Sequence, residues 1–137
     1  MLEKYYKYKV NYNEYIVLIK VGNFYECFNN DALILNSIFN YKIKRIKNSF
    51  KVGFPTSGID EATKRLKELN LSYIIVDNDD VNEYSDDNNK YKNYNYNLDV
   101  INYNYMRVEK INNYLNDNIL NDNISNILSE IEKKIMD

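Results

Sequence analysis

Two apolar runs rich in β-branched residues, with helical segments between them, constrain the fold more than any other feature. The runs are YIVLIK at Tyr15–Lys20 and LSYIIVD at Leu71–Asp77, and their near-continuous apolar character is typical of strands buried on both faces. Between them, apolar residues recur at helical spacing at about Ala32–Phe39 and Ile59–Leu69. Because a sheet buries its apolar faces under helices, this order predicts an α/β or α+β domain.

Further strands are predicted between these runs, so the sheet should be mixed, with about five or six strands flanked by helices. FYECF (Phe24–Phe28) and SFKVGF (Ser49–Phe54) are short apolar segments, and YKIKRIK (Tyr41–Lys47) alternates apolar with basic side chains. We also expect a short helix within residues 1–14 and a mobile acidic loop at Asn78–Lys90. The Tyr- and Asn-rich stretch that follows this loop should form one or two strands.

The C-terminal part shows a different pattern. From about Arg107 onward, isoleucine and leucine residues follow helical spacing, which is interrupted near Asn121 and Asp122. This predicts two amphipathic helices, and therefore a domain over residues 1–106 followed by a helical extension over residues 107–137. Two fates are open for the apolar stripes of this extension: packing on the preceding domain, or binding to protein partners or to a second copy through a helical seam.

Missing residue types exclude several classes of enzyme. There is no histidine, and Cys27 is the single cysteine, so intrachain disulfides, Ser-His-Asp or Cys-His catalysis and Cys/His zinc sites are ruled out. No phosphate loop of the G-x-x-x-x-G-K-[ST] type occurs. Asp79–Asp80 and Asp86–Asp87 could supply metal-binding carboxylates, but a solvated loop is the simpler interpretation. We therefore expect no enzyme activity, no cofactor and no metal.

Neither a membrane-spanning segment nor a secretory signal is expected. No run reaches the roughly 18 to 20 apolar residues of a membrane helix, and the polar, Tyr-rich start of the chain does not resemble a signal peptide. A cytoplasmic location, with Cys27 reduced, is the resulting expectation.

Charge is distributed unevenly along the chain. Residues 1–76 hold 12 Lys and Arg against 7 Asp and Glu, a balance of +5, whereas residues 77–137 hold 6 against 13, a balance of −7. A basic part beside an acidic part is compatible with a nucleic-acid-binding face next to a solvating segment. An excess of five charges is nevertheless common on ordinary domains.

Glu26 lies in an otherwise apolar predicted strand and raises a structural question. Side chains alternate along a strand, so Phe24, Glu26 and Phe28 share one face. If that face is buried, Glu26 loses its hydration at a cost of roughly several kcal/mol unless a nearby lysine pairs with it. If that face is open, an exposed aromatic ring lies beside an exposed acid.

Taken together, these segments resemble the N-terminal mismatch-recognition domain of the MutS family of DNA mismatch-repair proteins. The stretch Tyr15–Ile46 is similar to the family's hydrophobic strand, G-D-F-Y-E-x-F motif, D-A helix and strand ending in basic residues. VGFPTSGIDEATKRLKELNLSYIIVD is similar to the family's G-V-P-Y-H segment, helix and strand. The resemblance covers residues 1–77 well, is expected to continue weakly through a strand near Leu98–Val108, and does not reach the last helices.

The resemblance implies roles for individual residues. In the family, the Phe of F-x-E wedges into the base stack from the minor groove and the Glu hydrogen-bonds the displaced base, and these roles fall on Phe24 and Glu26. A mismatched step is already poorly stacked, so wedging costs less there and the difference provides selectivity. The basic residues of the following strand should contact phosphates and position the wedge; they are Lys42, Lys44, Arg45 and Lys47.

Some residues depart from the family pattern. Asn23 stands where the family usually has Asp, and Thr56–Ser57 stand where it usually has Tyr-His. The connector, lever, clamp and ATPase domains of family members have no counterpart in this sequence. The resemblance therefore implies a small stand-alone module that binds mismatched or distorted double-stranded DNA weakly and without ATP hydrolysis. The alternative is a protein-interaction domain that keeps the fold and has lost DNA binding.

Overall fold

The computed structural model describes residues 1–136, which fall into two compact units. The first unit spans Met1–Leu98 and the second begins at Asp99. The boundary expected from the sequence, between residues 106 and 107, falls inside a long helix of the second unit. None of the helices in the described residues is both long enough and apolar enough to span a membrane.

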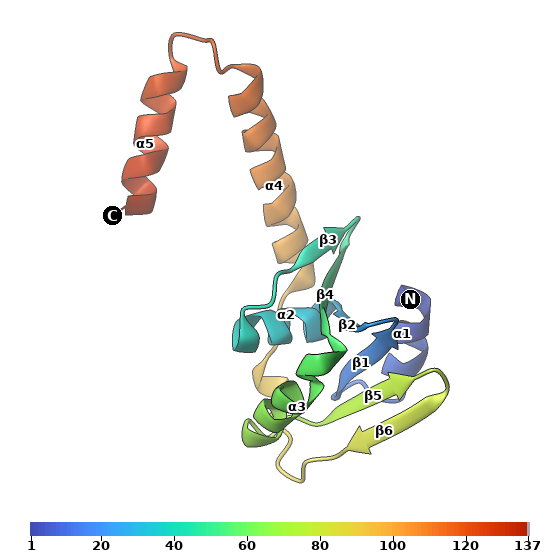
Figure 1. Ribbon diagram of the computed structural model, residues 1–137. Coiled ribbons are helices and arrows are strands. Elements are labelled where there is room, and N and C mark those ends of the chain that lie inside the picture. The colour runs from blue at the N-terminus through green and yellow to red at the C-terminus, as the bar shows by residue number, and fades with distance from the viewer. Residues whose placement is uncertain (137) are drawn as a thin grey trace. The chain divides into compact units, whose positions relative to one another are not determined.

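A mixed sheet of six strands forms the centre of the first unit, which confirms the predicted fold class (Figure 1). In chain order the strands are β1 Ile16–Val21, β2 Phe24–Phe28, β3 Lys44–Ile46, β4 Ser49–Pro55, β5 Tyr73–Asp77 and β6 Asp80–Tyr84. Across the sheet the order is β3-β4-β2-β1-β5-β6, and only β1 and β5 run parallel. The first four side chains of β1 are all buried, because helices cover both faces of the sheet at this central strand.

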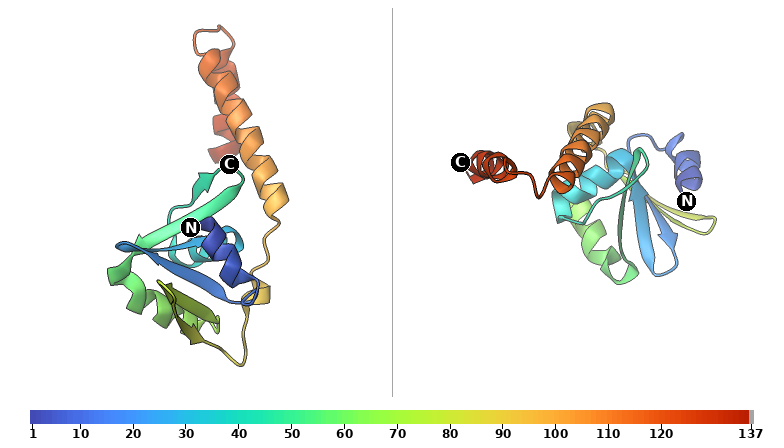
Figure 2. Two further views of the ribbon diagram at one scale, coloured as in Figure 1. Left: turned by 90° about the vertical axis from the view of Figure 1, so that its right-hand side faces the viewer. Right: turned by 90° about the horizontal axis from the view of Figure 1, so that it is seen from above.

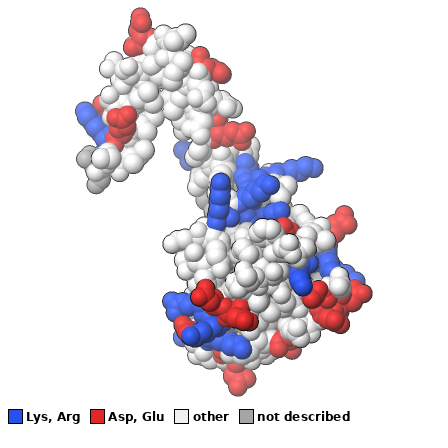
Figure 3. Space-filling view, in the orientation of Figure 1, with Lys and Arg blue, Asp and Glu red and all other residues white. Residues whose placement is uncertain are grey.

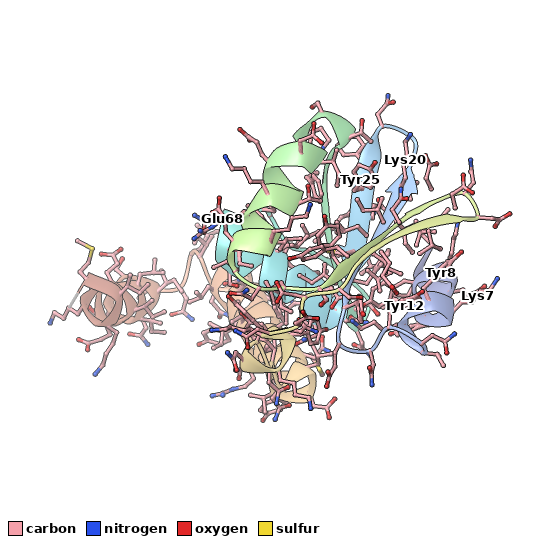
Figure 4. All side chains as sticks on the ribbon, turned by 90° about the horizontal axis from the view of Figure 1, so that it is seen from below. Lys7, Tyr8, Tyr12, Lys20, Tyr25 and Glu68 are labelled. Atoms are coloured by element: carbon pink, nitrogen blue, oxygen red, sulfur yellow. The ribbon has the colours of Figure 1, made fainter. Side chains whose placement is uncertain are left out.

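Helices lie on both faces of this sheet. α1 covers one face, and α2 and α3 cover the other (Figure 2). Figure 4 shows these layers from below, with Lys7 and Tyr8 of α1 on one side of the sheet and Glu68 of α3 on the other. The bounds are α1 Leu2–Lys9, α2 Asn29–Phe39 and α3 Ile59–Glu68, with short 3-10 helices η1 at Thr56–Gly58 and η2 at Tyr91–Asn93.

α1 covers only part of its face of the sheet. Tyr5 of α1 packs on Phe28 of β2 with ring centroids 5.4 Å apart. Both rings belong to a buried cluster that is completed by Val17, Ile19, Ile74 and Val76 from β1 and β5. Along the same face of β2, the exposed fraction rises from 4% at Phe28 to 49% at Phe24. The cover provided by α1 therefore ends within β2.

A buried carboxylate, Asp31 in the first turn of α2, joins several segments of the first unit. Its Oδ2 accepts hydrogen bonds from the Tyr5 hydroxyl at 2.7 Å and the Val17 amide at 3.1 Å. Its Oδ1 accepts one from the Tyr91 hydroxyl at 2.5 Å and lies 3.0 Å from the Lys9 ammonium. These partners supply the compensation that a fully buried acid requires. Burial, reinforced by the Asp31 charge, raises the pKa of both tyrosines, so both remain donors.

The strand predicted at Tyr41–Lys47 is shorter than expected, because β3 begins only at Lys44. The ring of Tyr41 stacks between Phe39 and Phe54, with centroid separations of 5.0 and 5.1 Å. The Asn36 side-chain amide also donates to the Tyr41 carbonyl at 2.8 Å. These contacts hold Tyr41 between the end of α2 and Phe54 of β4, and the chain joins the strand pairing of the sheet only at Lys44.

The prediction of a loop throughout Asn78–Lys90 was wrong, because β6 lies within it. β6 pairs with β5 around a two-residue turn, in which Asn78 has a φ of 54°, a conformation that asparagine tolerates. Four of the five side chains of β6 are exposed. An edge strand of this kind carries no apolar alternation, so the sequence pattern could not reveal it.

The second unit is helical, and the strand expected near Leu98–Val108 was wrong. Its helices are α4 Leu98–Asp117 and α5 Ile124–Met136, which confirms two helices separated near Asn121 and Asp122. The alternation of Tyr with Asn was interpreted as a strand although Ile101, Tyr105 and Val108 follow helical spacing. Among the described residues of this unit, only Ile124 is a buried apolar residue.

Candidate nucleic-acid interface

Phe24 is the first residue of β2 and lies at the end of the β1–β2 hairpin. Gly22 and Asn23 form a two-residue turn between the paired residues Val21 and Phe24. Gly22 has a φ of +59°, which glycine adopts without steric cost. The Thr56 amide donates to the Asn23 carbonyl at 2.9 Å. This backbone bond fixes the turn to the end of β4 and does not require the Tyr-His side chains usual in the family.

Glu26 points to the same face as Phe24 and has a lysine partner. Its Oε2 lies 3.1 Å from Nζ of Lys51 on β4, and its side chain is 15% exposed. Gly53 is the cross-strand neighbour of Glu26, so the position on β4 directly opposite the acid carries no side chain. Both alternatives considered for this face therefore hold in part: Phe24 is exposed, whereas Glu26 is mostly buried and paired.

A shallow trough crosses this face beside the Glu26–Lys51 pair. Its volume is about 360 Å³, and apart from the ion pair its lining is mainly apolar; the other lining residues are Met1, Leu2, Val21, Phe28, Ile46, Ser49 and Phe50. The trough thus places a carboxylate acceptor and an ammonium donor side by side on an apolar floor. Such a surface suits a flat ligand with polar edge atoms.

β3 divides the predicted basic residues between the two faces of the sheet. Lys44 is the cross-strand partner of Lys51, and Arg45 is that of Phe50. Successive strand residues point to opposite faces. Lys44 therefore shares the face of Glu26, and Arg45 does not.

Lys42 and Lys47 lie just outside the two ends of β3. Both side chains are exposed, and Lys47 has a φ of 54° in the turn to β4. Lys and Arg side chains gather over the position of β3 in the space-filling view (Figure 3). We call this group, Lys42, Lys44 and Lys47, the basic edge of the first unit.

The basic edge is separated from Phe24 by a distance that suits one DNA duplex. Lys44 on β3 lies level with Lys51 on β4 and Phe28 on β2. Phe24 is therefore offset from Lys44 by four residues along the strands and by two strands across the sheet. At ~3.4 Å per residue and ~4.8 Å per strand, Lys44 and Phe24 are about 17 Å apart in the sheet. This equals about five phosphate steps of ~3.4 Å, so both residues can face one duplex at different base steps.

Lys51 is the residue of this site that the sequence analysis missed. Its importance depends on the pairing of β2 with β4, which places it opposite Phe28 and diagonal to Glu26. A single sequence does not reveal this register. The alternation in SFKVGF does carry one signal, because Lys51 lies between buried Phe50 and Val52 and must point to the opposite face.

Within residues 1–136, Cys27 and the acidic side chains show no arrangement for metal binding. Cys27 is fully buried on the face opposite Glu26, and burial raises the pKa of its thiol well above the usual value. No group of three or more His, Cys, Asp or Glu side chains within residues 1–136 is placed to hold a metal ion.

Comparison with known families identifies the family of this chain. The family model described as MutS domain I matches residues 1–101, which is most of the chain. The chain therefore belongs to the MutS domain I family.

Its curated relatives are much longer proteins. The DNA mismatch repair proteins MutS of Thermotoga petrophila and Thermotoga maritima are each 30% identical to it over 77 residues. MutS of Thermus thermophilus is 27% identical over 81 residues. Each alignment covers 56% of this chain and 10% of the relative, so the chain spans about a tenth of the length of the curated relatives it matches.

Proposed function

We propose that this chain is a mismatch-recognition module that binds double-stranded DNA, with Phe24 as the wedge and Glu26 as the contact to the displaced base. Membership of the MutS domain I family supports the general function. The observation that carries the residue assignment is the 49% exposure of Phe24, at the open end of a strand whose Glu26 lies on the same face.

The wedge acts by exploiting the weaker stacking of a mismatched step. Inserting an apolar ring between two base pairs costs roughly a few kcal/mol in lost stacking and bends the duplex. At a mismatch part of that stacking is already lost, so the same insertion costs less. The selectivity arises from this difference and needs no readout of the surrounding sequence.

Lys51 reduces the electrostatic repulsion between Glu26 and the phosphates of DNA. A carboxylate without a partner is repelled by phosphates, and the ammonium 3.1 Å away offsets that charge. A carboxylate has about four acceptor positions, so Glu26 can stay paired with Lys51 and also accept a hydrogen bond from a base.

The basic edge contacts phosphates and orients the duplex on the first unit. Three lysines that each neutralise one phosphate give a salt dependence with a slope of about −3 in log K against log salt. Arg45, on the opposite face of β3, reaches a phosphate only where the duplex curves around the edge. Binding by so few contacts is weak, and it is best measured at low salt.

We also propose that the chain has no catalytic turnover and requires no cofactor. The sequence lacks histidine and a phosphate-binding glycine loop. Phosphate release from ATP above background, abolished by a point substitution in the chain, contradicts this part of the proposal. A cytoplasmic location also stays a prediction.

The test of the proposed function is binding of the purified chain to matched and mismatched duplexes of one sequence, followed by fluorescence anisotropy at low salt. The expected result is weak binding to both, with a several-fold preference for the mismatched duplex. Equal affinity for the two duplexes contradicts mismatch recognition, and binding to neither contradicts DNA binding.

A protein-interaction domain without DNA binding is the second candidate. Two observations favour it: Glu26 already has a partner in Lys51, and α4 and α5 display large exposed apolar side chains such as Val108, Ile111 and Ile135. Self-association through these helices is part of this candidate. It predicts concentration-dependent mass in sedimentation together with no retention on DNA at low salt.

A further inference from the structure

The Glu26–Lys51 pair is built as a unit rather than as two separate side chains. The two residues come from different strands, whose antiparallel pairing fixes both backbones, and Nζ of Lys51 lies 3.1 Å from Oε2 of Glu26. Their side chains are 15% and 24% exposed, respectively. Both therefore retain some contact with solvent, and the pair presents one acceptor beside one donor.

The surroundings of the pair leave room for a flat group. Gly53 flanks Glu26 without a side chain, and a Cβ at this position would already lie 3.8 Å from the Glu26 Cγ. The trough of about 360 Å³ on this face has the pair as its charged element and Val21, Phe28 and Ile46 among its apolar lining. A planar ring can lie against this lining while its edge meets the pair.

We propose that Lys51 is a specificity-determining residue, and that Glu26 and Lys51 together bind the Watson–Crick edge of an unpaired base. This inference rests on the proposed function and extends it to a second residue. Each base carries an N–H donor and an adjacent acceptor on that edge. Glu26 accepts the hydrogen bond from the base N–H, and Lys51 donates to the neighbouring oxygen or ring nitrogen.

This chemistry distinguishes mismatched from matched DNA independently of the wedge. In a matched pair the Watson–Crick edge is occupied by the opposite base, so neither group of the ion pair can reach it. A displaced base offers the whole edge. Lys51 thus contributes to discrimination, whereas a lysine that contacts only phosphates contributes equally to both duplexes.

Lys44 provides a matched control within the same sheet. It is the cross-strand neighbour of Lys51 and shares its face, but it is not among the residues that line the trough. Lys51→Met and Lys44→Met remove the same charge from adjacent positions. Any general loss of electrostatic attraction to DNA therefore appears in both variants.

The experiment compares these two variants on matched and mismatched duplexes, with thermal unfolding of each variant as a check on folding. Lys51→Met is expected to weaken mismatched binding about 5- to 10-fold and matched binding about twofold or less, while Lys44→Met weakens both equally. If Lys51→Met behaves like Lys44→Met, the inference is wrong and the proposed function still stands. If wild type lacks a mismatch preference, the proposed function itself fails.

A modified duplex tests the chemistry directly and remains informative if Lys51→Met unfolds. A mismatched thymine is replaced by a nonpolar ring of the same shape that lacks edge donors and acceptors. Wild type should lose several-fold affinity for this duplex relative to the thymine mismatch, and Lys51→Met should then bind it at most about twofold more weakly than wild type. Undiminished wild-type affinity for the nonpolar ring overturns the proposed edge contact.

Discussion

Phe24 and Phe28 lie on the same face of the same strand, four residues apart, yet one is 49% and the other 4% exposed. The difference comes from α1, whose eight residues extend about 12 Å and cover only the Phe28 end of β2. The covered end contributes to the hydrophobic core. The open end keeps the Phe24 ring at the surface, whereas the lysines on this face, Lys51 and Lys44, lie level with Phe28.

The comparison is tested most strongly by truncating each ring. Phe28→Ala removes a buried ring from the cluster under α1 and should lower the free energy of unfolding by about 3–4 kcal/mol. Phe24→Ala should change it by less than about 0.5 kcal/mol, because its ring packs little. Urea unfolding monitored by circular dichroism measures both. Similar losses for the two variants contradict the division of β2 into a covered and an open end.

The covered end also depends on the buried Asp31. Asp31→Asn removes the charge that Lys9 neutralises and should destabilise the fold by about 3 kcal/mol, because Lys9 then lacks its anionic partner. Asp60→Asn, an exposed change in the first turn of α3, serves as the control and should cost less than about 1 kcal/mol. If Asp31→Asn unfolds at the same urea concentration as wild type, the network does not stabilise the unit.

Stability should also decline at alkaline pH through three buried groups of the first unit. Burial raises the pKa of Cys27, Tyr5 and Tyr91 in the folded state, so above about pH 9 only the unfolded chain releases these protons and unfolding is favoured. Each such group lowers the free energy of unfolding by about 1.4 kcal/mol per pH unit, once it is fully deprotonated in the unfolded chain and still protonated in the folded one. Burial lowers the pKa of Lys9, so this group alone would make the folded state more stable as the pH rises. It is one group, whereas three groups act in the other direction.

The measurement is the unfolding free energy between pH 7 and pH 10. The expected result is a plateau near neutrality and a loss of roughly 1–2 kcal/mol by pH 10. Stability that increases over this range argues against the buried hydroxyls and thiol as the controlling groups.

On β3, the smallest expected effect separates the neighbouring basic residues Lys44 and Arg45. Lys44→Ala should weaken matched and mismatched binding equally and reduce the salt slope by about one unit or less. Arg45→Ala should change the slope by less than half as much, because Arg45 points to the opposite face of β3. Salt titrations of both variants on both duplexes measure the difference. Equal slopes for the two variants show that the face of β3 on which a residue lies does not determine whether it contacts phosphates.

The success of the sequence analysis varied with the kind of signal. β1, β2, α2, α3 and β5 were predicted because burial imposes apolar patterns on their sequences. β6 was missed because its side chains are exposed, and α4 was taken partly for a strand because Tyr and Asn alternate along a helix with little buried surface. At the candidate site, the roles that the family motif implies for Phe24 and Glu26 stay predictions, and Lys51 required the β2–β4 register, which no local pattern records.

The most direct test of the account is the ratio of mismatched to matched DNA affinity for wild type and for Phe24→Ala at low salt. We predict a several-fold preference in wild type and a ratio close to one in the variant, whose affinity for the matched duplex changes little. A preference that survives in Phe24→Ala contradicts the role of Phe24 as the wedge, and the absence of a preference in wild type contradicts mismatch recognition by this chain.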